Sequence, residues 1–363
     1  MRIALVSPNF AEYAALTAKG LESECDVVLF ADAINYQQEV GDREKIGPAA
    51  LRLEKLESIT GWLRVIRAVR KFNPDVIHLQ EPGGGRKTIG MLLLALYFFF
   101  KVPLVLTVHD PVPHAGNDYR IAARSRVLKK LLRSLPRTIV LHGRYCVDLF
   151  APQKRKWQVL HSIDHGVILS PAALQKAKPQ QNHFLFFGRM EAYKGLRVLC
   201  EAIDVLQSKD VQFSVCFAGR GPELGYVKQR LKLHSNVEIV EGFISPGDLI
   251  REIQRAEFVV VPYTEATQSG VVSAAYANGR FVLASSVGGL VNVVSNDRDG
   301  ILVPAGDISA LSSAIQATLQ DRDLMVRLSE GAEATANGRL SWTKICKELV
   351  VIYGSTSRAV PVL

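Results

Sequence analysis

The chain has 363 residues, of which 48% are hydrophobic, and its net charge at pH 7 is +9. At about 150 residues per domain this length predicts two domains, and the ordinary apolar fraction excludes disordered, collagen-like and fibrous chains. The five cysteines are scattered singly, which argues against a disulfide framework or a zinc site and predicts a reducing compartment. Residues 1–170 carry a net charge of +8 and residues 171–363 a net charge of +1, so an anionic partner is expected to contact the first half.

The first half alternates short apolar runs with helical patterns. Its N-terminal run is too short for a signal peptide and predicts a first strand. The strands are expected at residues 3–7, 26–30, 75–79, 103–109 and 138–141, and helices at residues 61–71 and 86–100. Residues 91–100 form the longest uncharged apolar run, about half of the roughly 20 residues that cross a bilayer, and therefore predict a buried helix.

The second half repeats this alternation. Strands are expected at residues 183–187, 212–218, 237–240, 258–262, 281–285 and 300–303, and helices at residues 194–208, 223–233, 246–255, 308–320, 322–337 and 342–353. Consecutive apolar side chains in the strands and intervening helices indicate doubly wound α/β domains with parallel sheets. Residues 354–363 show no periodicity.

The boundary between the domains is expected in the Pro-, Gln- and Lys-rich segment at residues 170–181. The sequence therefore predicts an N-terminal domain at residues 1–175, a C-terminal domain at residues 176–340 and a C-terminal helix and tail at residues 341–363. Both domains are long enough to bury a core of their own.

The most informative segment is FFGRMEAYKGL at residues 186–196, in which a strand runs into a turn that opens a helix. Such a turn presents backbone N–H groups and the positive end of the helix dipole, and Arg189 and Lys194 add two cations. This combination suits a diphosphate. An ordinary surface turn is the alternative for this segment taken alone.

Two later turns have a similar character. In AGRGPELG, residues 218–225, the glycine spacing differs from the dinucleotide fingerprint, so a nucleotide contact and a tight βα turn both stay open. In VPYTEATQSGVVSAAYANG, residues 261–279, the helix start at Ser269 exposes amides to an anion, and Glu265 is placed to accept hydrogen bonds from sugar hydroxyls. A capped helix with a solvated Glu265 is the alternative.

A basic segment at residues 118–137 carries seven Lys or Arg residues against one acid, with apolar residues at helical spacing. It predicts either an amphipathic helix on an anionic bilayer or a packed helix whose basic face is only solvated. The first alternative assigns four cations to the acceptor or membrane side, namely Arg124, Lys129, Lys130 and Arg133. Without a series of interleaved aromatic residues, nucleic acid is not expected as a partner.

Taken together and in this order, the three turns resemble those of GT-B glycosyltransferases, in particular the retaining enzymes of family 4, also called glycosyl transferases group 1. The resemblance is strongest over residues 183–320, which include VEGFISPGDLIREIQRAEFVVVPY and DGILVPAGD, and extends to LTVHD, HGRYC and DHGV in the first half. It implies two Rossmann-like doubly wound domains facing across a cleft. The nucleotide-sugar donor is then expected on the second domain and the acceptor on the first.

The resemblance also implies roles for individual residues. Arg189 and Lys194 would hold the donor diphosphate, and His109 would lie beside the donor sugar. The implied catalytic set is His109, Arg189, Lys194 and Glu265. The implied donor-binding set adds to the two cations Gly188, Gly219, Gln268, Ser269, Gly270 and Val271. No metal ion and no cofactor are implied, because the nucleotide sugar is a substrate.

One position departs from the family pattern. Family members usually carry a second Glu eight positions after the first, where this chain has Ser273, or Ala274 by a count from the end of the helix. The ribose contact of that Glu and the role of Glu265 are therefore open. Asp297 and Asp299 have the spacing of a metal site, but their polar setting before a strand predicts a turn.

We therefore expect a retaining, metal-independent glycosyltransferase that moves a sugar from a nucleotide-sugar donor to a hydroxyl acceptor. By analogy, the acceptor is a lipid-linked or polysaccharide intermediate of exopolysaccharide or lipopolysaccharide synthesis. The protein is expected in the cytoplasm, peripheral on the inner face of the cytoplasmic membrane. The alternatives are a catalytically silent GT-B-like binding subunit at the membrane and a nucleotide-sugar epimerase of the same fold.

Overall fold

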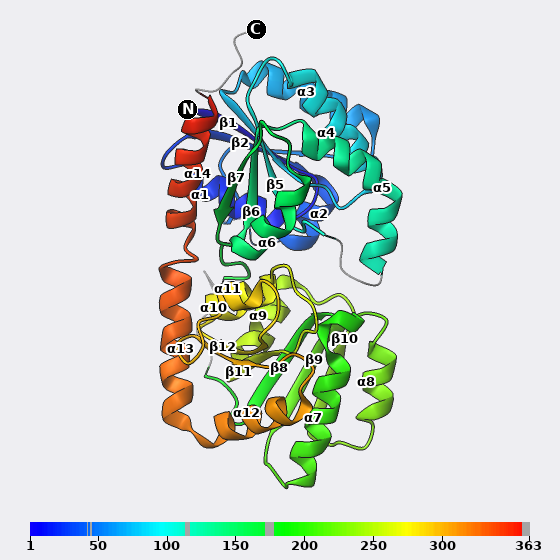
Figure 1. Cartoon of the computed structure of the whole chain (residues 1–363), viewed down its shortest axis with the longest axis vertical. Helices are drawn as coiled ribbons and strands as arrows, with labels where there is room; N and C mark the ends of the chain where they lie inside the picture. The colour runs from blue at the N-terminus through cyan, green and yellow to red at the C-terminus, as the bar shows by residue number, and fades with distance from the viewer. Residues whose placement is uncertain (42, 44–45, 113–116, 171–177, 358–363) are drawn as a thin grey trace. The chain divides into compact units, whose positions relative to one another are not determined.

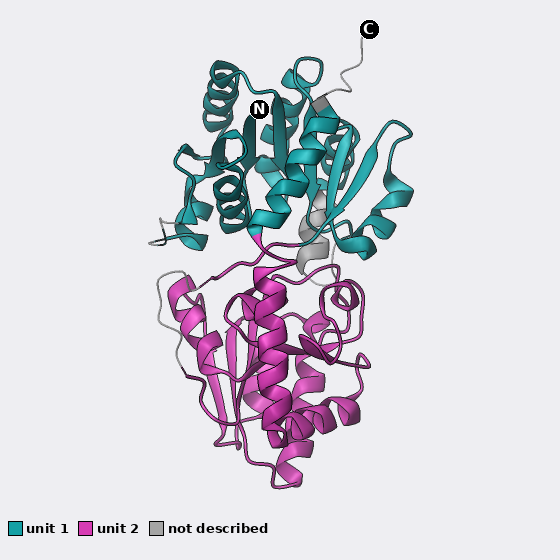
Figure 2. Ribbon diagram, turned by 90° about the vertical axis from the view of Figure 1, so that its left-hand side faces the viewer, with its two compact units in different colours: residues 1–113, 117–164, 342–363 teal, residues 114–116, 165–341 magenta. Residues whose placement is uncertain are grey.

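The computed structural model describes residues 1–41, 43, 46–112, 117–170 and 178–357. These residues divide into two compact units (Figure 2). The first unit comprises the chain up to Asp164 together with the chain from Trp342 onward, and the second unit comprises His165–Ser341. The expectation of two α/β domains is confirmed.

Within the described residues, the first unit contains a seven-stranded parallel sheet with the strand order β3-β2-β1-β4-β5-β6-β7. The order reverses between β1 and β4, as in a Rossmann-like fold. Most of its central strands are buried over their whole length, which suits their runs of consecutive apolar residues. The strands are β1 (Arg2–Ser7), β2 (Asp26–Asp32), β3 (Leu51–Glu54), β4 (Val76–Gln80), β5 (Leu104–Val108), β6 (Thr138–His142) and β7 (Val159–Ile163).

The helices of the first unit lie in two layers, one on each side of this sheet (Figure 1). One layer contains α1 (Ala11–Leu21), α2 (Ala33–Glu39) and α14 (Trp342–Ser357). The other contains α3 (Ile59–Phe72), α4 (Gly85–Phe98), α5 (Asn117–Ser134) and α6 (Gly143–Phe150), the last followed by the short η2 (Ala151–Gln153).

The second unit contains, among its described residues, a six-stranded parallel sheet with the order β10-β9-β8-β11-β12-β13, which has the same reversal between β8 and β11. Its strands are β8 (His183–Arg189), β9 (Ser214–Arg220), β10 (Val237–Glu241), β11 (Phe258–Val261), β12 (Phe281–Ser285) and β13 (Gly300–Val303). Its helices are η3 (Ala192–Lys194), α7 (Leu196–Ser208), α8 (Leu224–Arg230), α9 (Pro246–Arg255), α10 (Gly270–Ala277), α11 (Leu290–Val293), α12 (Ile308–Gln320) and α13 (Arg322–Asn337).

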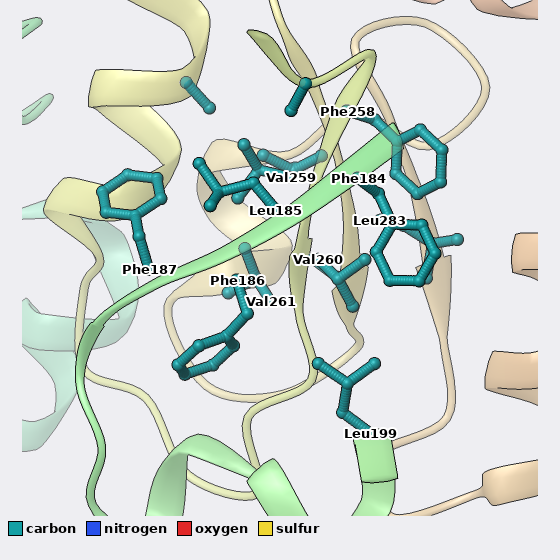
Figure 3. Packing of buried hydrophobic residues seen from close by; sticks show 14 of the residues in the cluster. Phe184, Leu185, Phe186, Phe187, Leu199, Phe258, Val259, Val260, Val261 and Leu283 are labelled. Carbon is teal, nitrogen blue, oxygen red and sulfur yellow. The ribbon is translucent and has the colours of Figure 1, made fainter. Parts of the chain in front are cut away.

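Aromatic side chains stack across the strands of this second sheet. Phe184 on β8 lies opposite Phe258 on β11, with ring centroids 5.4 Å apart, and Phe258 stacks on Phe281 of β12 at the same distance. Figure 3 shows the two side chains of the first pair among the aliphatic residues of the core. This continuous apolar layer holds the central strands in register, so the turns that follow them have defined positions.

Two strands and several helices were not predicted. The missing strands, β3 and β7, are the edge strands of the first sheet, and their exposed, partly polar residues do not form the apolar runs that marked the central strands. The prediction of no periodicity after residue 353 was wrong for the first positions, because α14 continues to Ser357. Residues 358–363 lie outside the described residues.

The prediction that residues 91–100 form a buried helix was wrong for one side of α4. The inner side packs into the core through Met91, Leu94, Ala95 and Phe98, but the outer side is exposed. Helical periodicity explains the difference, because a helix against one face of a sheet buries only the stripe that faces it. No helix among the described residues is long and apolar enough to cross a membrane.

The units also differ from the expected ranges 1–175, 176–340 and 341–363. The change between units falls after Asp164, because the residues that follow bind to the second unit: the side chain of Asn278 donates a hydrogen bond to the carbonyl of Leu169. The C-terminal helix belongs to the first unit. Its apolar stripe, including Ile345 and Leu349, packs into the core beside α1.

A buried histidine ties α14 to the first sheet. His78 on β4 has its Nδ1 2.6 Å from the Tyr353 hydroxyl and its Nε2 2.7 Å from the Thr107 hydroxyl on β5. Burial lowers the pKa of His78 to about 3, because the charged ring would be desolvated. The neutral ring is therefore part of the packing between the helix and the sheet.

This histidine predicts an acid sensitivity of the first unit. Above the ordinary pKa of 6.5 the ring is neutral in both the folded and the unfolded chain, whereas below it only the unfolded chain takes up the proton. Stability of this unit is therefore expected to fall as the pH drops from about 6.5 towards 3, and to fall less in His78→Gln. Urea unfolding near pH 7 and pH 5 measures this, and tryptophan fluorescence follows this unit because Trp62, Trp157 and Trp342 all lie in it. Equal losses in wild type and variant would contradict the assignment.

Candidate functional site

The reversal of strand order in the second unit lies between β8 and β11, which are neighbours in the sheet. Chain connections leave such a pair in opposite directions, and ligands of open parallel sheets bind beside the carboxyl ends of the strands at this point. Two of the three turns selected from the sequence, residues 186–196 and 261–279, follow these two strands. The topology therefore brings them to the same edge of the sheet.

The ends of β8 and β9 approach each other closely at two glycines. Gly188 pairs with Gly219, and a Cβ atom on Gly219 would lie 2.0 Å from the carbonyl oxygen of Gly188, so no side chain fits there. A Cβ atom on Gly188 would lie 3.9 Å from Lys194 Nζ and 3.7 Å from Val271 Cγ2. The structure thus brings together Gly188, Gly219, Lys194 and Val271, four of the predicted site residues.

Lys194 is buried, with 8% of its surface exposed. Its Nζ donates a hydrogen bond of 2.6 Å to the hydroxyl of Tyr263 and lies 4.2 Å from the centre of the Tyr263 ring. Tyr263 is the second residue after the end of β11. The next residue, Gly195, has a positive φ of 69°, and a Cβ atom on it would lie 1.8 Å from the carbonyl oxygen of Pro262. The turn that follows β8 therefore packs directly against the turn that follows β11. This close contact explains why the residue after Lys194 is a glycine.

Arg189 is exposed at the end of β8 and donates a hydrogen bond of 3.2 Å to the hydroxyl of Tyr193. The rings of Tyr193 and Tyr263 meet edge to face with centroids 6.3 Å apart. A tyrosine hydroxyl therefore accepts a hydrogen bond from each of the two cations. Burial raises the pKa of Tyr263, so this phenol stays neutral. Sequence reasoning missed both tyrosines, because nothing in their spacing shows that they contact the cations.

The third turn leads into α10. Ser269 is the N-cap residue of this helix, and Gly270 and Val271 form its first turn, whose amides have no acceptor within the helix. Two backbone hydrogen bonds fix the start of this turn: the N–H of Thr264 donates to the carbonyl of Tyr193 at 2.8 Å, and the N–H of Gly289 donates to the carbonyl of Ala266 at 3.0 Å.

The remaining predicted residues of this turn have different settings. Glu265 is exposed. Gln268 is half-buried, and its Oε1 is a buried acceptor for which the described part of the chain supplies no hydrogen-bond donor. At the position of the second family Glu, Ser273 is buried and its hydroxyl donates to the carbonyl of His165 at 3.3 Å. Ala274 is buried as well, so neither position presents a carboxylate.

His109 belongs to the first unit, where it follows β5, and it is 2% exposed. Its Nε2 donates to Gln80 Oε1 at 2.8 Å, and its Nδ1 accepts from His142 Nε2 at 3.2 Å, an arrangement that fixes the tautomer. Phe10 lies against the ring, with centroids 4.1 Å apart, and adopts a left-handed φ of 55°. Such strain in a non-glycine residue is concentrated at functional sites.

Sequence reasoning missed His142 and Gln80 as partners of His109. Each of the three residues lies at the carboxyl end of a strand, and β4, β5 and β6 are consecutive neighbours in the sheet. The quoted motifs LTVHD and HGRYC contain both histidines. The signal was therefore present, but it becomes a contact only once the strand order is known.

The basic segment forms α5, as predicted, but one of its four selected cations does not face solvent. Arg133 makes two hydrogen bonds of 2.7 and 2.9 Å to the buried carboxylate of Glu81, so its side chain is largely withdrawn from solvent and does not fit a contact with a membrane surface. Its assignment to the acceptor side stays a prediction. Lys130 is exposed and Lys129 is half-buried. The backbone of Arg124 lies in α5, but its side chain is outside the described residues.

The turn before β13 is structural, as its sequence suggested. Asp299 is buried, and its carboxylate accepts hydrogen bonds from the Tyr276 hydroxyl and the Thr335 hydroxyl, both at 2.8 Å, and from the Ser295 amide at 2.7 Å. These bonds join the turn to α10 and α13. In the part of the chain that the structure describes, no group of three or more His, Cys, Asp or Glu side chains is placed to hold a metal ion.

The contact between Lys194 and Tyr263 predicts a stability effect. Tyr263→Phe removes one hydrogen-bond acceptor of the buried Lys194 ammonium but keeps the ring, so the group loses that bond and keeps its desolvation cost. The free energy of unfolding of the second unit is expected to fall by about 1–3 kcal/mol. Circular dichroism during urea unfolding measures the change in Tyr263→Phe, Lys194→Met and the double variant. Effects that add within about 0.5 kcal/mol would show that the pair is not coupled.

Comparisons with known proteins match both halves of the chain to glycosyltransferases. Residues 181–321 match the family model described as glycosyl transferases group 1, and residues 11–167 match that of glycosyltransferase family 4. The chain is 22% identical over 321 residues to the glycogen synthase of Mycobacterium tuberculosis, covering 85% of this chain and 73% of that one. It is 27% identical over 292 residues to the phosphatidyl-myo-inositol mannosyltransferase of Mycobacterium leprae, covering 77% and 73% of the two chains.

A solved structure shares the fold over nearly the whole chain. Anabaena Alr3699/HepE in complex with UDP-glucose superposes with a TM-score of 0.73 at 16% sequence identity, covering 98% of this chain and 100% of that one. The two sheets and their strand orders thus correspond to the two domains of a GT-B fold. With both halves matched by the family models, this chain belongs to the group 1 glycosyltransferases.

Proposed function

We propose that this chain transfers a sugar from a nucleotide-sugar donor to a hydroxyl acceptor, with retention of configuration and without a metal ion. The observation that carries the proposal is the convergence of Lys194, the side-chain-free position Gly188 and the start of α10 at the strand-order reversal of the second unit. The similarity to a glycogen synthase and to a structure solved in complex with UDP-glucose supports a nucleotide-sugar donor.

The proposed chemistry is electrostatic. When the bond between sugar and diphosphate breaks, negative charge develops on the departing phosphate. Lys194, Arg189 and the first amides of α10 would stabilise this charge, and they are held in place before the reaction by Tyr263, Tyr193 and the packed turns. A phenol oxygen is a neutral acceptor, so the hydrogen bond from Lys194 to Tyr263 does not itself neutralise the ammonium charge.

We assign His109 to the sugar side of the reaction. Its ring is fixed by Gln80 and His142, so its position beside a donor sugar would be well defined. Glu265, which is exposed, is proposed to bind sugar hydroxyls.

The proposed acceptor is a lipid-linked or polysaccharide intermediate of cell-surface glycan synthesis, at the inner face of the cytoplasmic membrane. The net charge of +8 on residues 1–170 and the exposed cations of α5 support an anionic surface as partner of the first unit. The buried Ser273 at the position of a family Glu favours a second candidate, a catalytically silent binding subunit. Transfer or donor hydrolysis by the purified protein distinguishes the two.

The donor can be identified by thermal stabilisation, because a ligand at 100 times its Kd stabilises the folded chain by about 2.7 kcal/mol. With that donor, Arg189→Ala and Lys194→Ala are each expected to reduce binding or turnover about 10- to 150-fold, the equivalent of one charge-assisted hydrogen bond. Rates are compared per folded molecule.

A matched control is Arg197→Ala. This arginine is an exposed cation of the same unit, paired with Glu223 at 2.8 Å, and its loss is expected to leave donor binding unchanged. Unchanged kinetics in both Arg189→Ala and Lys194→Ala would remove the donor assignment.

His109→Ala is expected to lower kcat more than it raises the donor KM, because the ring would act on the reacting sugar and not on the nucleotide. The substitution also removes a buried hydrogen-bond partner from Gln80 and from His142, so unfolding is measured alongside the steady-state rates. If the variant is less stable but its rate per folded molecule is intact, His109 is a packing residue.

A further inference from the structure

Helix α4 is apolar on almost all sides, and such helices are normally buried. Here only the inner side is covered. Six large side chains on the helix and just beyond its end are exposed by 38% to 79%, among them Phe99. The other five share one side of the helix, and we call them the α4 face: Ile89, Leu93, Leu96, Tyr97 and Phe100. They recur at three- and four-residue spacing, so they form one stripe along the helix. Contiguous exposed apolar patches of this kind mark interaction sites.

The helices on either side of this stripe are basic. Figure 1 shows α3, α4 and α5 side by side on one side of the first sheet, and both neighbours pack against α4. The exposed cations of these three helices include Arg67, Arg70 and Lys71 on α3, Arg86 on α4, Lys101 just after α4, and Arg126 and Lys130 on α5. Arg64 on α3 is exposed as well, but its charge is paired with Glu54 at 2.9 Å. Residues 59–72, 85–101 and 125–137 contain no Asp or Glu. An apolar stripe is therefore bordered by positive charge on both sides.

We propose that the α4 face docks on an anionic lipid bilayer, with its apolar side chains in the boundary between headgroups and acyl chains and the flanking cations against the headgroups. An in-plane amphipathic surface of this composition gains from both apolar burial and electrostatic attraction. Val127 on the neighbouring α5 is also exposed, by 79%. The inference rests on the membrane association proposed above and names the surface responsible, which is centred on α4 and not on α5.

The charge distribution favours a bilayer over a second copy of the chain. In a symmetric dimer the same patch faces itself, so the cations of α3 and α5 would meet like charges. A bilayer with anionic headgroups places opposite charge on both flanks of the stripe at once. The surface lies on the helical layer of the first unit, so the second unit's donor residues are not part of it.

Flotation of the full-length protein with lipid vesicles tests this proposal. Binding is expected to phosphatidylcholine vesicles that contain phosphatidylglycerol, to be weak without the anionic lipid, and to fall as salt rises from about 0.1 M to 1 M. Leu93→Gln with Phe100→Gln is expected to lower the partition coefficient about 100-fold. Arg67→Gln with Arg126→Gln, one cation on each flank, is expected to lower it about 30-fold.

Matched controls lie on the opposite helical layer of the same unit. Val351→Gln replaces an apolar residue that is 73% exposed on α14, and Lys344→Gln with Lys347→Gln removes two cations from that helix. These variants are expected to bind vesicles like the wild type. Donor hydrolysis in the absence of lipid should be the same in all variants, so a failure of the docking surface is distinguishable from a failure of the transferase assignment.

The outcomes separate the possible partners of the α4 face. Equal vesicle binding by wild type and the α4-face variants, or equal binding to neutral and anionic vesicles, would overturn the proposal. So would a dimer in solution that Leu93→Gln with Phe100→Gln dissociates, because the face would then belong to a second copy. A monomeric protein that does not bind vesicles of either composition would also overturn the proposal.

Discussion

The close approach of β8 and β9 at Gly188 and Gly219 is the constraint on which the chemistry of the second unit depends. Pairing continues to the ends of both strands because Gly219 carries no side chain: a Cβ atom there would lie 2.0 Å from the carbonyl oxygen of Gly188. The turn after β8 is thereby directed towards the turn after β11. Lys194 can then reach Tyr263 across the strand-order reversal, and the start of α10 lies beside both.

The second unit buries a positively charged side chain, Lys194, at a site proposed to bind an anion. A buried ammonium needs a hydrogen-bond acceptor, but a carboxylate acceptor would cancel the attraction for an anionic ligand. The phenol of Tyr263 supplies Lys194 with a neutral hydrogen-bond acceptor. Tyr193 holds Arg189 in the same way, although that arginine is exposed and loses less hydration.

The first unit has helical layers of different character on the two sides of its sheet. The layer of α1 and α14 is joined to the core through apolar packing and the buried His78, whereas the layer of α3, α4 and α5 exposes apolar and basic residues together. One positive side chain of that layer is withdrawn from solvent, because Arg133 neutralises the buried Glu81. Charge counted along the sequence therefore overstates the charge that a partner meets.

Local sequence patterns were enough to predict the central strands, the alternation of the two α/β units, and the turns that carry Gly188, Arg189 and Lys194, because apolar runs and glycine-rich turns are properties of neighbouring residues. The edge strands β3 and β7 were not predicted, because most of their residues are exposed or half-buried and do not form a run of apolar residues. Tertiary structure alone decided that Tyr263 holds Lys194, that His142 and Gln80 hold His109, and that the outer side of α4 is uncovered. These contacts join residues distant in the chain, and only the order of strands in a sheet determines which distant residues become neighbours.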